Sequence, residues 1–339
     1  PILRQGAIRG VIYMDNRLTA GAFTAERTAL LKALSTQVAI SLENANAISE
    51  MQALNRAYDR FVPKAFLRLL GKESVLDIEL GDQQIREMVI LFADIRNFTS
   101  LCEAIPAGET FTLMNDYLEA VTAAIHRHGG IIDKFIGDGI MALFPNDADA
   151  ALAAAVGMQQ ALQDFNQLRR DKGETPIRIG IGLHAGTVTL GTVGAERRLS
   201  TTVIGDPVNL AARLEAFTKV NGVGIQVSGE LVAMLQYPER FHLRQVGFLK
   251  MKGKAHKIKV YEEFSVGPPA LVDQTHRLLA DFEAAIAALD RHNFREAARR
   301  FDDYLAKHPE DNVARYYRQV CARQRESGKG KRDEWVLEA

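Results

Sequence analysis

Apolar residues along the chain fall into short continuous runs and helical periods, and this pattern predicts a mixed α+β domain. The run Met88–Ile95 is almost wholly apolar, as in a strand that is buried on both faces. Two apolar runs flank Gly137-Asp138-Gly139 and predict a hairpin, while residues 110–127 and 147–171 predict helices. Strands and helices that alternate around a central hairpin favour a ferredoxin-like, split-βαβ sheet.

The same pattern continues to about residue 264 and then becomes helical. Apolar runs predict strands in "IRIGIGLHAG", "GIQVS" and "KIKVYEEF", and a helix in "PVNLAARLEAFTKV". The tail, residues 274–325, has helical periodicity throughout. Within it Ala297, Phe301, Tyr304 and Pro309 match the spacing in the second half of a tetratricopeptide-like hairpin. One such hairpin is too small to be stable alone, so we expect it to dock on its neighbour.

The N-terminal part of the chain predicts a strand, a turn and a long helix. The strand is expected over Ala7–Asn16, and Thr24 is placed to cap the helix. One strand and one helix cannot enclose a core, so this segment is interpreted as the end of a domain. The run "GVIYMDN…FTAERTALLKALSTQVAISLENA" resembles the C-terminal end of a GAF sensor domain, which we assign to residues 1–46.

The helix is expected to continue into a signalling linker, residues 47–80. Its apolar positions recur at spacings of 7, 4, 3, 4 and 3, which suits a parallel two-helix coiled coil. These positions are Ile40, Ala47, Met51, Leu54, Tyr58 and Phe61. Pro63 is expected to end or kink the helix. The alternative is a single amphipathic helix that lies on its own domain.

Composition limits the partners of the chain. Lys plus Arg and Asp plus Glu both number 42, a balance that argues against binding to nucleic acid or to anionic lipid through bulk charge. The two cysteines, Cys102 and Cys321, fit neither a disulfide framework nor a metal cluster, and we expect a cytoplasmic location. The sequence has neither an apolar run of about 18 residues nor a signal peptide. Because the chain opens on Pro1, we interpret it as a piece of a longer protein with an upstream sensor.

Two acidic residues stand at positions suited to metal ions. Asp94 ends an apolar strand, and Asp138 lies in a Gly-Asp-Gly turn where a ligand can approach the backbone closely. On neighbouring strands they would hold a pair of Mg²⁺ or Mn²⁺ ions against a polyphosphate. Taken singly, Asp138 also fits an ordinary hairpin turn, and Asp94 fits a buried ion pair with Arg96 or Lys134.

An amide and a cation form a second candidate cluster. Asn209 and Arg213 are four residues apart on an expected helix that begins near Pro207, so they share one face. Together they would orient a sugar oxygen and neutralise charge that develops on a phosphate. The pair taken alone also fits an exposed polar helix face.

These segments together resemble the catalytic domain of class III nucleotidyl cyclases, which we assign to residues 81–266. The resemblance is carried, in chain order, by "ILFADIRNFTSL", "IIDKFIGDGIMALF", "RIGIGLHAGTVTLGTVG", "TTVIGDPVNLAARLE" and "MKGKAHKIKVYEE". It implies an enzyme that converts ATP to 3′,5′-cyclic AMP and pyrophosphate by in-line attack of the ribose 3′-hydroxyl on the α-phosphate. It also implies two metal ions per site and a homodimer whose sites are shared between subunits.

The resemblance implies a role for each matching residue. The metal ligands are Asp94, Asp138 and the carbonyl of Ile95; Lys134 and Thr202 recognise the purine; Asn209 orients the ribose; Arg213 stabilises the transition state; and Lys252 binds the terminal phosphates. The metal ligands are expected from one subunit and the purine, ribose and arginine residues largely from the other. That arrangement agrees with a dimeric linker upstream.

The purine pair favours adenine. A lysine ammonium donates to the N1 acceptor of adenine, and a threonine hydroxyl accepts from its amine, whereas guanine presents a donor at N1. Thr202 stands where many adenylate cyclases have aspartate, which places the chain in a threonine-bearing bacterial subgroup. The alternatives are a guanylate cyclase and a catalytically silent nucleotide-binding module.

Overall fold

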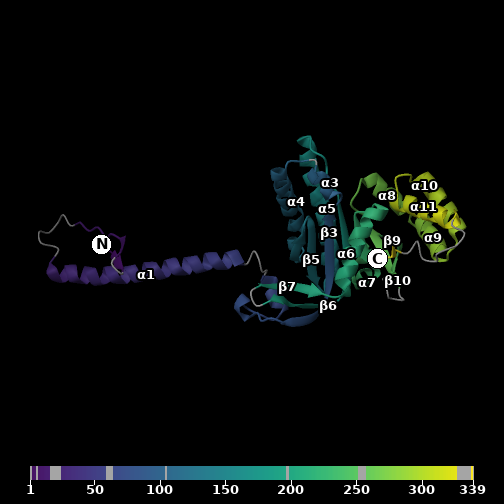
Figure 1. Ribbon diagram of the computed structural model, residues 1–339. Coiled ribbons are helices and arrows are strands. Elements are labelled where there is room, and N and C mark those ends of the chain that lie inside the picture. The colour runs from purple at the N-terminus through teal and green to yellow at the C-terminus, as the bar shows by residue number, and fades with distance from the viewer. Residues whose placement is uncertain are drawn as a thin grey trace. The chain divides into compact units, whose positions relative to one another are not determined.

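The computed structural model describes residues 2–4, 7–15, 24–58, 64–103, 105–195, 198–250, 257–326 and 337–338. The chain divides into two compact units, Pro1–Lys64 and Ala65–Ala339. Figure 1 shows the elements of both units. No helix of the described residues is long and apolar enough to cross a membrane.

The first unit is a small hairpin with one long helix. Strands β1 (Ile2–Arg4) and β2 (Ala7–Gly10) pair antiparallel, and α1 spans Ala25–Tyr58. Thr24 Oγ1 accepts a hydrogen bond from the Arg27 amide at 3.3 Å, which confirms the predicted cap. The strand predicted over Ala7–Asn16 is wrong beyond Gly10, because Val11–Asp15 forms no regular structure and Asn16 lies outside the described residues.

The apolar positions of α1 are exposed. Ala39 is buried, whereas Leu34, Val38, Met51 and Leu54 are 42–67% exposed. These side chains are thus available to a second helix, and the coiled coil stays a prediction. Phe61 and Pro63, which complete the predicted seam and end the helix, lie outside the described residues.

The second unit is built on one mixed sheet. Its strands run in the order β11-β9-β10-β8-β6-β3-β5-β4, with β7 paired to β6. They span β3 Gln83–Ile95, β4 Ile131–Ile136, β5 Gly139–Pro145, β6 Ile179–Ala195, β7 Arg198–Ile204, β8 Ile225–Ser228, β9 Leu243–Lys250, β10 Lys257–Glu263 and β11 Leu337–Glu338. The fold class is therefore α+β, as the sequence predicts.

The helices of this unit lie on both faces of the sheet and in the tail. Those beside the sheet are α2 (Lys64–Leu69), α3 (Phe98–Glu103), α4 (Ala107–Arg127), α5 (Ala148–Asp171), α6 (Asp206–Asn221) and α7 (Gly229–Met234). The tail contains α8 (Pro269–Arg277), α9 (Leu279–Asp290), α10 (Phe294–Lys307) and α11 (Asn312–Glu326). Two 3₁₀ turns, Val75–Asp77 and Pro238–Arg240, complete the described elements.

Alternate residues of β3 belong to opposite cores, which explains its continuous apolar run. Val89 and Leu91 pack with residues of α4, α5 and α7, whereas Met88 and Ile90 pack with residues of α2 and α6. Helix α6 lies close to β6 because that strand carries glycine there. A Cβ at Gly182 would lie 2.1 Å from the backbone nitrogen of Glu215. This close approach fixes the helix that carries several candidate site residues.

The helical tail docks on the sheet, as expected for a unit too small to stand alone. Phe282, Phe301 and Tyr317 from the tail share a core with Leu214 and Val246. Arg244 on β9 is buried and pairs with Glu262 at 2.6 Å and with Asp311 at 2.5 Å. Asp311 also accepts a hydrogen bond from the Ala314 amide at the start of α11. The tail is thus tied to the sheet by apolar contacts and by a buried ion network; its tetratricopeptide-like character stays a prediction.

Candidate active site

The two candidate metal ligands meet at one edge of the sheet. Asp94 lies near the end of β3 and Asp138 in the turn between β4 and β5, where Gly137 has a φ of +62°. Strands β3 and β5 pair up to Ala93 and Ile140, which brings the two acids together. The Ile95 amide donates to Asp138 Oδ2 at 3.1 Å. This backbone contact fixes the Asp138 carboxyl beside Asp94.

Both burial and the neighbouring Asp94 affect the pKa of Asp138. Burial, then a hydrogen bond with Asp94 and the charge of Asp94, raise the pKa of Asp138 to about 6. Two carboxylates in this position repel each other when both are ionised. A divalent cation removes that repulsion. The described residues contain no cluster of three His, Cys, Asp or Glu side chains, so any metal here depends on two carboxylates and on other oxygen atoms.

A lysine that the sequence did not single out pairs with Asp94. Lys219 Nζ on α6 lies 2.8 Å from Asp94 Oδ2 and 3.8 Å from Glu215 Oε1. The alternative partners suggested from sequence were wrong. Lys134 contacts Asp133 and Thr202 instead, and Arg96 donates to the carbonyl of Val223. The i, i+4 spacing of Glu215 and Lys219 was the local signal that these side chains share a helix face.

Glu215 is a buried carboxyl beside this cluster. Its side chain is 10% exposed, and no hydrogen bond to a described residue reaches Oε1. Burial raises the pKa of Glu215 to about 7, against the opposing charge of Lys219. Tyr117, fully buried nearby, has a hydroxyl without a hydrogen-bond partner among the described residues. A buried carboxyl oxygen and a buried hydroxyl, both without a hydrogen-bond partner among the described residues, therefore lie behind the carboxylate edge.

The structure brings the two purine candidates into contact. Lys134 on β4 donates from Nζ to Thr202 Oγ1 on β7 at 2.6 Å, although 68 residues separate them. Thr202 in turn donates to Asp133 Oδ2 at 3.3 Å, and Lys134 Nζ lies 3.2 Å from the same oxygen. Strand β7 was not predicted from the sequence. The glycine-rich run before it, which forms the end of β6, favours a turn by its local pattern.

Asn209 and Arg213 lie on a different face of α6 from Lys219. Both side chains lack a hydrogen bond or ion pair to any residue that the structure describes. At 100° per residue, the Asn209–Arg213 face and the Glu215–Lys219 face are about 120° apart around the helix. The predicted start of the helix at Pro207 is confirmed. Of these two faces, the Glu215–Lys219 face is the one that contacts Asp94 among the described residues.

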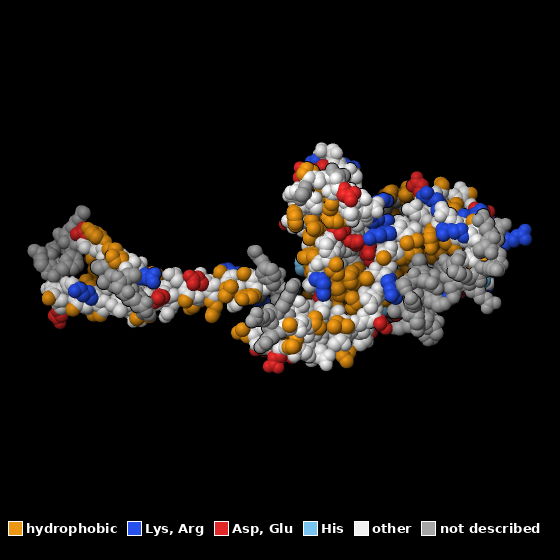
Figure 2. Space-filling model, in the orientation of Figure 1, with side chains coloured by type: hydrophobic (Ala, Val, Ile, Leu, Met, Phe, Trp, Pro, Cys, Tyr) orange, Lys and Arg blue, Asp and Glu red, His pale blue; other side chains and the backbone are white. Residues whose placement is uncertain are grey.

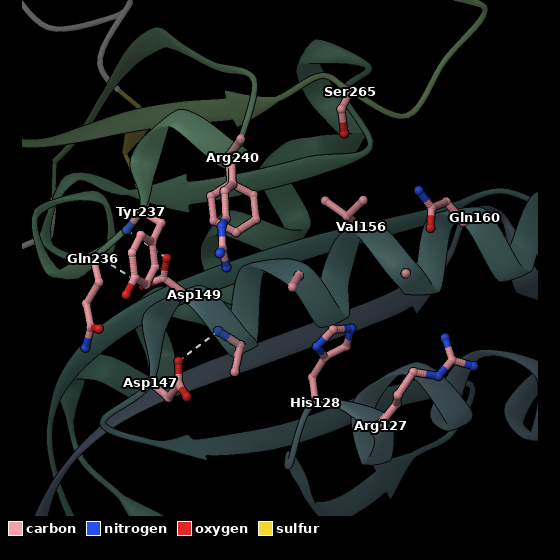
Figure 3. A pocket seen from close by; sticks show the side chains of 14 residues that line it. Arg127, His128, Asp147, Asp149, Val156, Gln160, Gln236, Tyr237, Arg240 and Ser265 are labelled. Carbon is pink, nitrogen blue, oxygen red and sulfur yellow. Dashed lines mark hydrogen bonds between the residues drawn. The ribbon is translucent and has the colours of Figure 1, made fainter.

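The remaining candidates are Lys252 and Ile95. Lys252 lies outside the described residues, in the segment 251–256. Ile95 is buried and paired with Ile179, and its amide is the group that contacts Asp138. None of the candidates lines the cavity of about 550 Å³ shown in Figure 3. There Asp147 and Asp149 accept from backbone amides, and the Arg240 guanidinium lies 4.4 Å from the Tyr237 ring centre.

Comparison with known proteins identifies the family. The adenylate and guanylate cyclase catalytic domain matches residues 80–262. An adenylate cyclase of Anabaena cylindrica is 46% identical over 212 residues, 61% of this chain and 42% of that protein. The terminal-differentiation-specific adenylate cyclase of Dictyostelium discoideum is 31% identical over 281 residues, 81% of this chain and 13% of that protein. A crystal structure of an adenylyl cyclase from P. aeruginosa has a TM-score of 0.50 and 31% identity, covering 55% of this chain and 97% of that chain.

The mixed sheet with paired carboxylates at its edge is thus the fold of a nucleotide cyclase catalytic domain. Because the match spans more than half of the chain, the chain belongs to the adenylate and guanylate cyclase family. It spans less than half the length of these two curated relatives.

Proposed function

We propose that the chain is the catalytic part of an adenylate cyclase, which forms 3′,5′-cyclic AMP and pyrophosphate from ATP. The observation that carries the choice of ATP is the contact between Lys134 and Thr202 at 2.6 Å. An ammonium has three donors, and Thr202 and Asp133 engage two of them. The third is available to an acceptor such as N1 of adenine.

Thr202 completes the preference for adenine. Its hydroxyl donates to Asp133 and accepts from Lys134, which leaves one lone pair for the amine of adenine. Guanine would present its N1–H to the Lys134 ammonium, donor against donor. A guanylate cyclase, the second activity in the family name, is disfavoured by this arrangement.

The carboxylate edge fits two Mg²⁺ or Mn²⁺ ions, held by Asp94, Asp138 and the carbonyl of Ile95. The fit rests on two neighbouring carboxyls, since burial and then Asp94 raise the pKa of Asp138 to about 6. Bound ions would lower the pKa of the ribose 3′-hydroxyl and neutralise the triphosphate. The Ile95 amide holds Asp138 in place, and Lys219 holds Asp94. Lys252 is assigned to the terminal phosphates by resemblance alone.

Asn209 and Arg213 are proposed to act in the site of a second subunit. They have no partner among the described residues and lie on the face of α6 turned from the carboxylates of their own chain. Asn209 would orient the ribose, and Arg213 would neutralise the charge of the transition state.

Exposed apolar residues give a homodimer a surface to bury. Near Lys134 and Thr202, Phe135, Ile136 and Ile204 are 50–58% exposed. Figure 2 shows hydrophobic side chains gathered on this unit. Met51 and Leu54, exposed on α1 downstream of the proposed GAF-like segment, support a dimer as well.

Complementation tests the shared site. Asp94→Ala and Arg213→Ala are each expected to be inactive, and mixing them should restore one intact site per heterodimer. Cyclic AMP formation is measured after subunit exchange, with each variant alone as the control. A mixture that stays inactive although heterodimers form would contradict the shared site. Wild-type chain that binds ATP without turnover in Mn²⁺ would favour the silent module.

A further inference from the structure

A basic pocket lies between the catalytic sheet and the tail. It encloses about 400 Å³ where the turn after β3, the end of α6 and the start of α11 meet. Four cationic side chains line it: Arg96, Arg178, Lys219 and Arg315. Among the described residues that line it there is no Asp or Glu. A concave site with this charge attracts anions.

Backbone contacts build the pocket. The Arg96 amide donates to the carbonyl of Arg178 at 2.8 Å, which joins the β3 turn to the start of β6. Gly222 follows the last residue of α6, and a Cβ there would lie 2.9 Å from Cβ of Asn312. The tail therefore abuts the end of α6. Helix α11 lies outside residues 80–262, so part of this pocket is not part of the family's catalytic domain.

The pocket contains buried donors without acceptors. Asn221 is 1% exposed, its Oδ1 accepts from the Val223 amide, and its Nδ2 has no partner among the described residues. The Nε of Arg96 is likewise buried and unpartnered within the described chain. Buried donors nearly always have a hydrogen-bond partner, so two unpartnered donors in residues that line the pocket favour an acceptor there.

Two of these cations, Arg178 and Arg315, form no ion pair with a carboxylate of the described residues. Arg178 forms no ion pair with a described residue. Within the part of the chain that the structure describes, Arg315 donates to the Glu310 carbonyl and to Asn312 Oδ1. Guanidinium groups match phosphate oxygens in pairs, and several together favour an anion with more than one charge. Lys219 differs from these two cations, because Asp94 and Glu215 lie near it at the carboxylate edge.

We propose that this pocket binds a phosphate-bearing anion of about the size of a diphosphate, and that its binding draws Lys219 away from Asp94. The proposed effect on Lys219 rests on the proposed function, in which Asp94 is a metal ligand. Lys219 Nζ now lies 2.8 Å from Asp94. An anion in the pocket competes for that ammonium and leaves the carboxylate free for a cation. An anion bound beside the tail would thereby affect metal binding in the active site.

Calorimetric titration of inorganic pyrophosphate into the wild-type chain, in EDTA, tests the site without metal or turnover. Arg315→Gln removes one exposed cation from the pocket and is expected to weaken binding about tenfold or more. Arg323→Gln, on the same helix but not among the pocket's lining residues, is the matched control and should bind as wild type does. A parallel titration with ATP distinguishes a free anion from the phosphates of a nucleotide.

Several outcomes overturn the site. The first is that pyrophosphate does not bind without metal. The second is equal binding of pyrophosphate by wild type and Arg315→Gln. The third is loss of binding in Asp138→Asn alone, which would place the anion at the carboxylate edge. The coupling is tested by Mn²⁺ binding to nucleotide-free protein, with sulfate against chloride at equal ionic strength. Sulfate should tighten Mn²⁺ binding in wild type and not in Arg315→Gln. An unchanged Mn²⁺ affinity would overturn the coupling and leave the anion site standing.

Discussion

Replacing Lys219 by Met should strengthen metal binding, because a cation has to displace this lysine from Asp94. The ammonium lies 2.8 Å from Asp94 Oδ2, and the two side chains are 44% and 29% exposed. Ion pairs with such exposure contribute about 0.2–1 kcal/mol. At about 1.4 kcal/mol per factor of ten, the apparent dissociation constant for Mn²⁺ should fall by about 1.4- to fivefold.

The assay is Mn²⁺ titration of nucleotide-free protein, followed by the electron paramagnetic resonance signal of the free ion. Lys219→Arg keeps the charge and should bind as wild type does. Lys172→Met, at the exposed end of α5, controls for the loss of one positive charge elsewhere. If Lys219→Met binds Mn²⁺ no better than wild type, then either Lys219 does not compete with the metal or Asp94 is not a ligand.

Two further predictions concern stability. The pKa of Glu215 in the folded chain, about 7, lies above its value of about 4.5 in the unfolded chain. Protonated Glu215 therefore stabilises the fold at low pH, and this stabilisation is lost as the pH rises from about 4.5 through 7. Glu215→Gln should therefore raise the melting temperature at pH 8 and change it little at pH 4; equal effects at both would contradict the assignment. Asp311→Ala would leave buried Arg244 without one of its two carboxylates and should cost about 3–5 kcal/mol in urea unfolding, while Asp303→Ala, at an exposed pair, should cost under about 1 kcal/mol.

Local patterns predicted most of the second unit. The buried strand β3, the turn at Asp138 and the long helix α5 each follow from a few consecutive residues, and the structure contains all three. Strand β7 did not follow, because Gly191 and Gly194 in the preceding segment suggest a turn. In the fold, that segment continues as β6 and pairs with Gln83 as far as Gly191. Tertiary pairing overrides the local preference there.

The candidate site could be predicted only in part, since its contacts join distant segments. The approach of Asp94 to Asp138 follows from two adjacent strands, which apolar runs reveal. Lys219 reaches Asp94 across 125 residues, through the close packing of α6 on β6, and no pattern in the sequence reports that distance. The purine pair was found by resemblance and not by spacing. The structure adds that Asp133 links Lys134 to Thr202.

The most direct test of the account is the ratio of kcat/KM for ATP to that for GTP, in wild type and in Lys134→Glu. Wild type should form cyclic AMP and prefer ATP. Lys134→Glu replaces the donor to adenine N1 by an acceptor. One mismatched hydrogen bond at a desolvated site costs about 1–3 kcal/mol, so the ratio should fall by about tenfold or more. Lys259→Glu, on β10 away from the purine pair, is the control. A wild-type preference for GTP, or an unchanged ratio in Lys134→Glu, would contradict the assignment of this chain as an adenylate cyclase that recognises its base through Lys134.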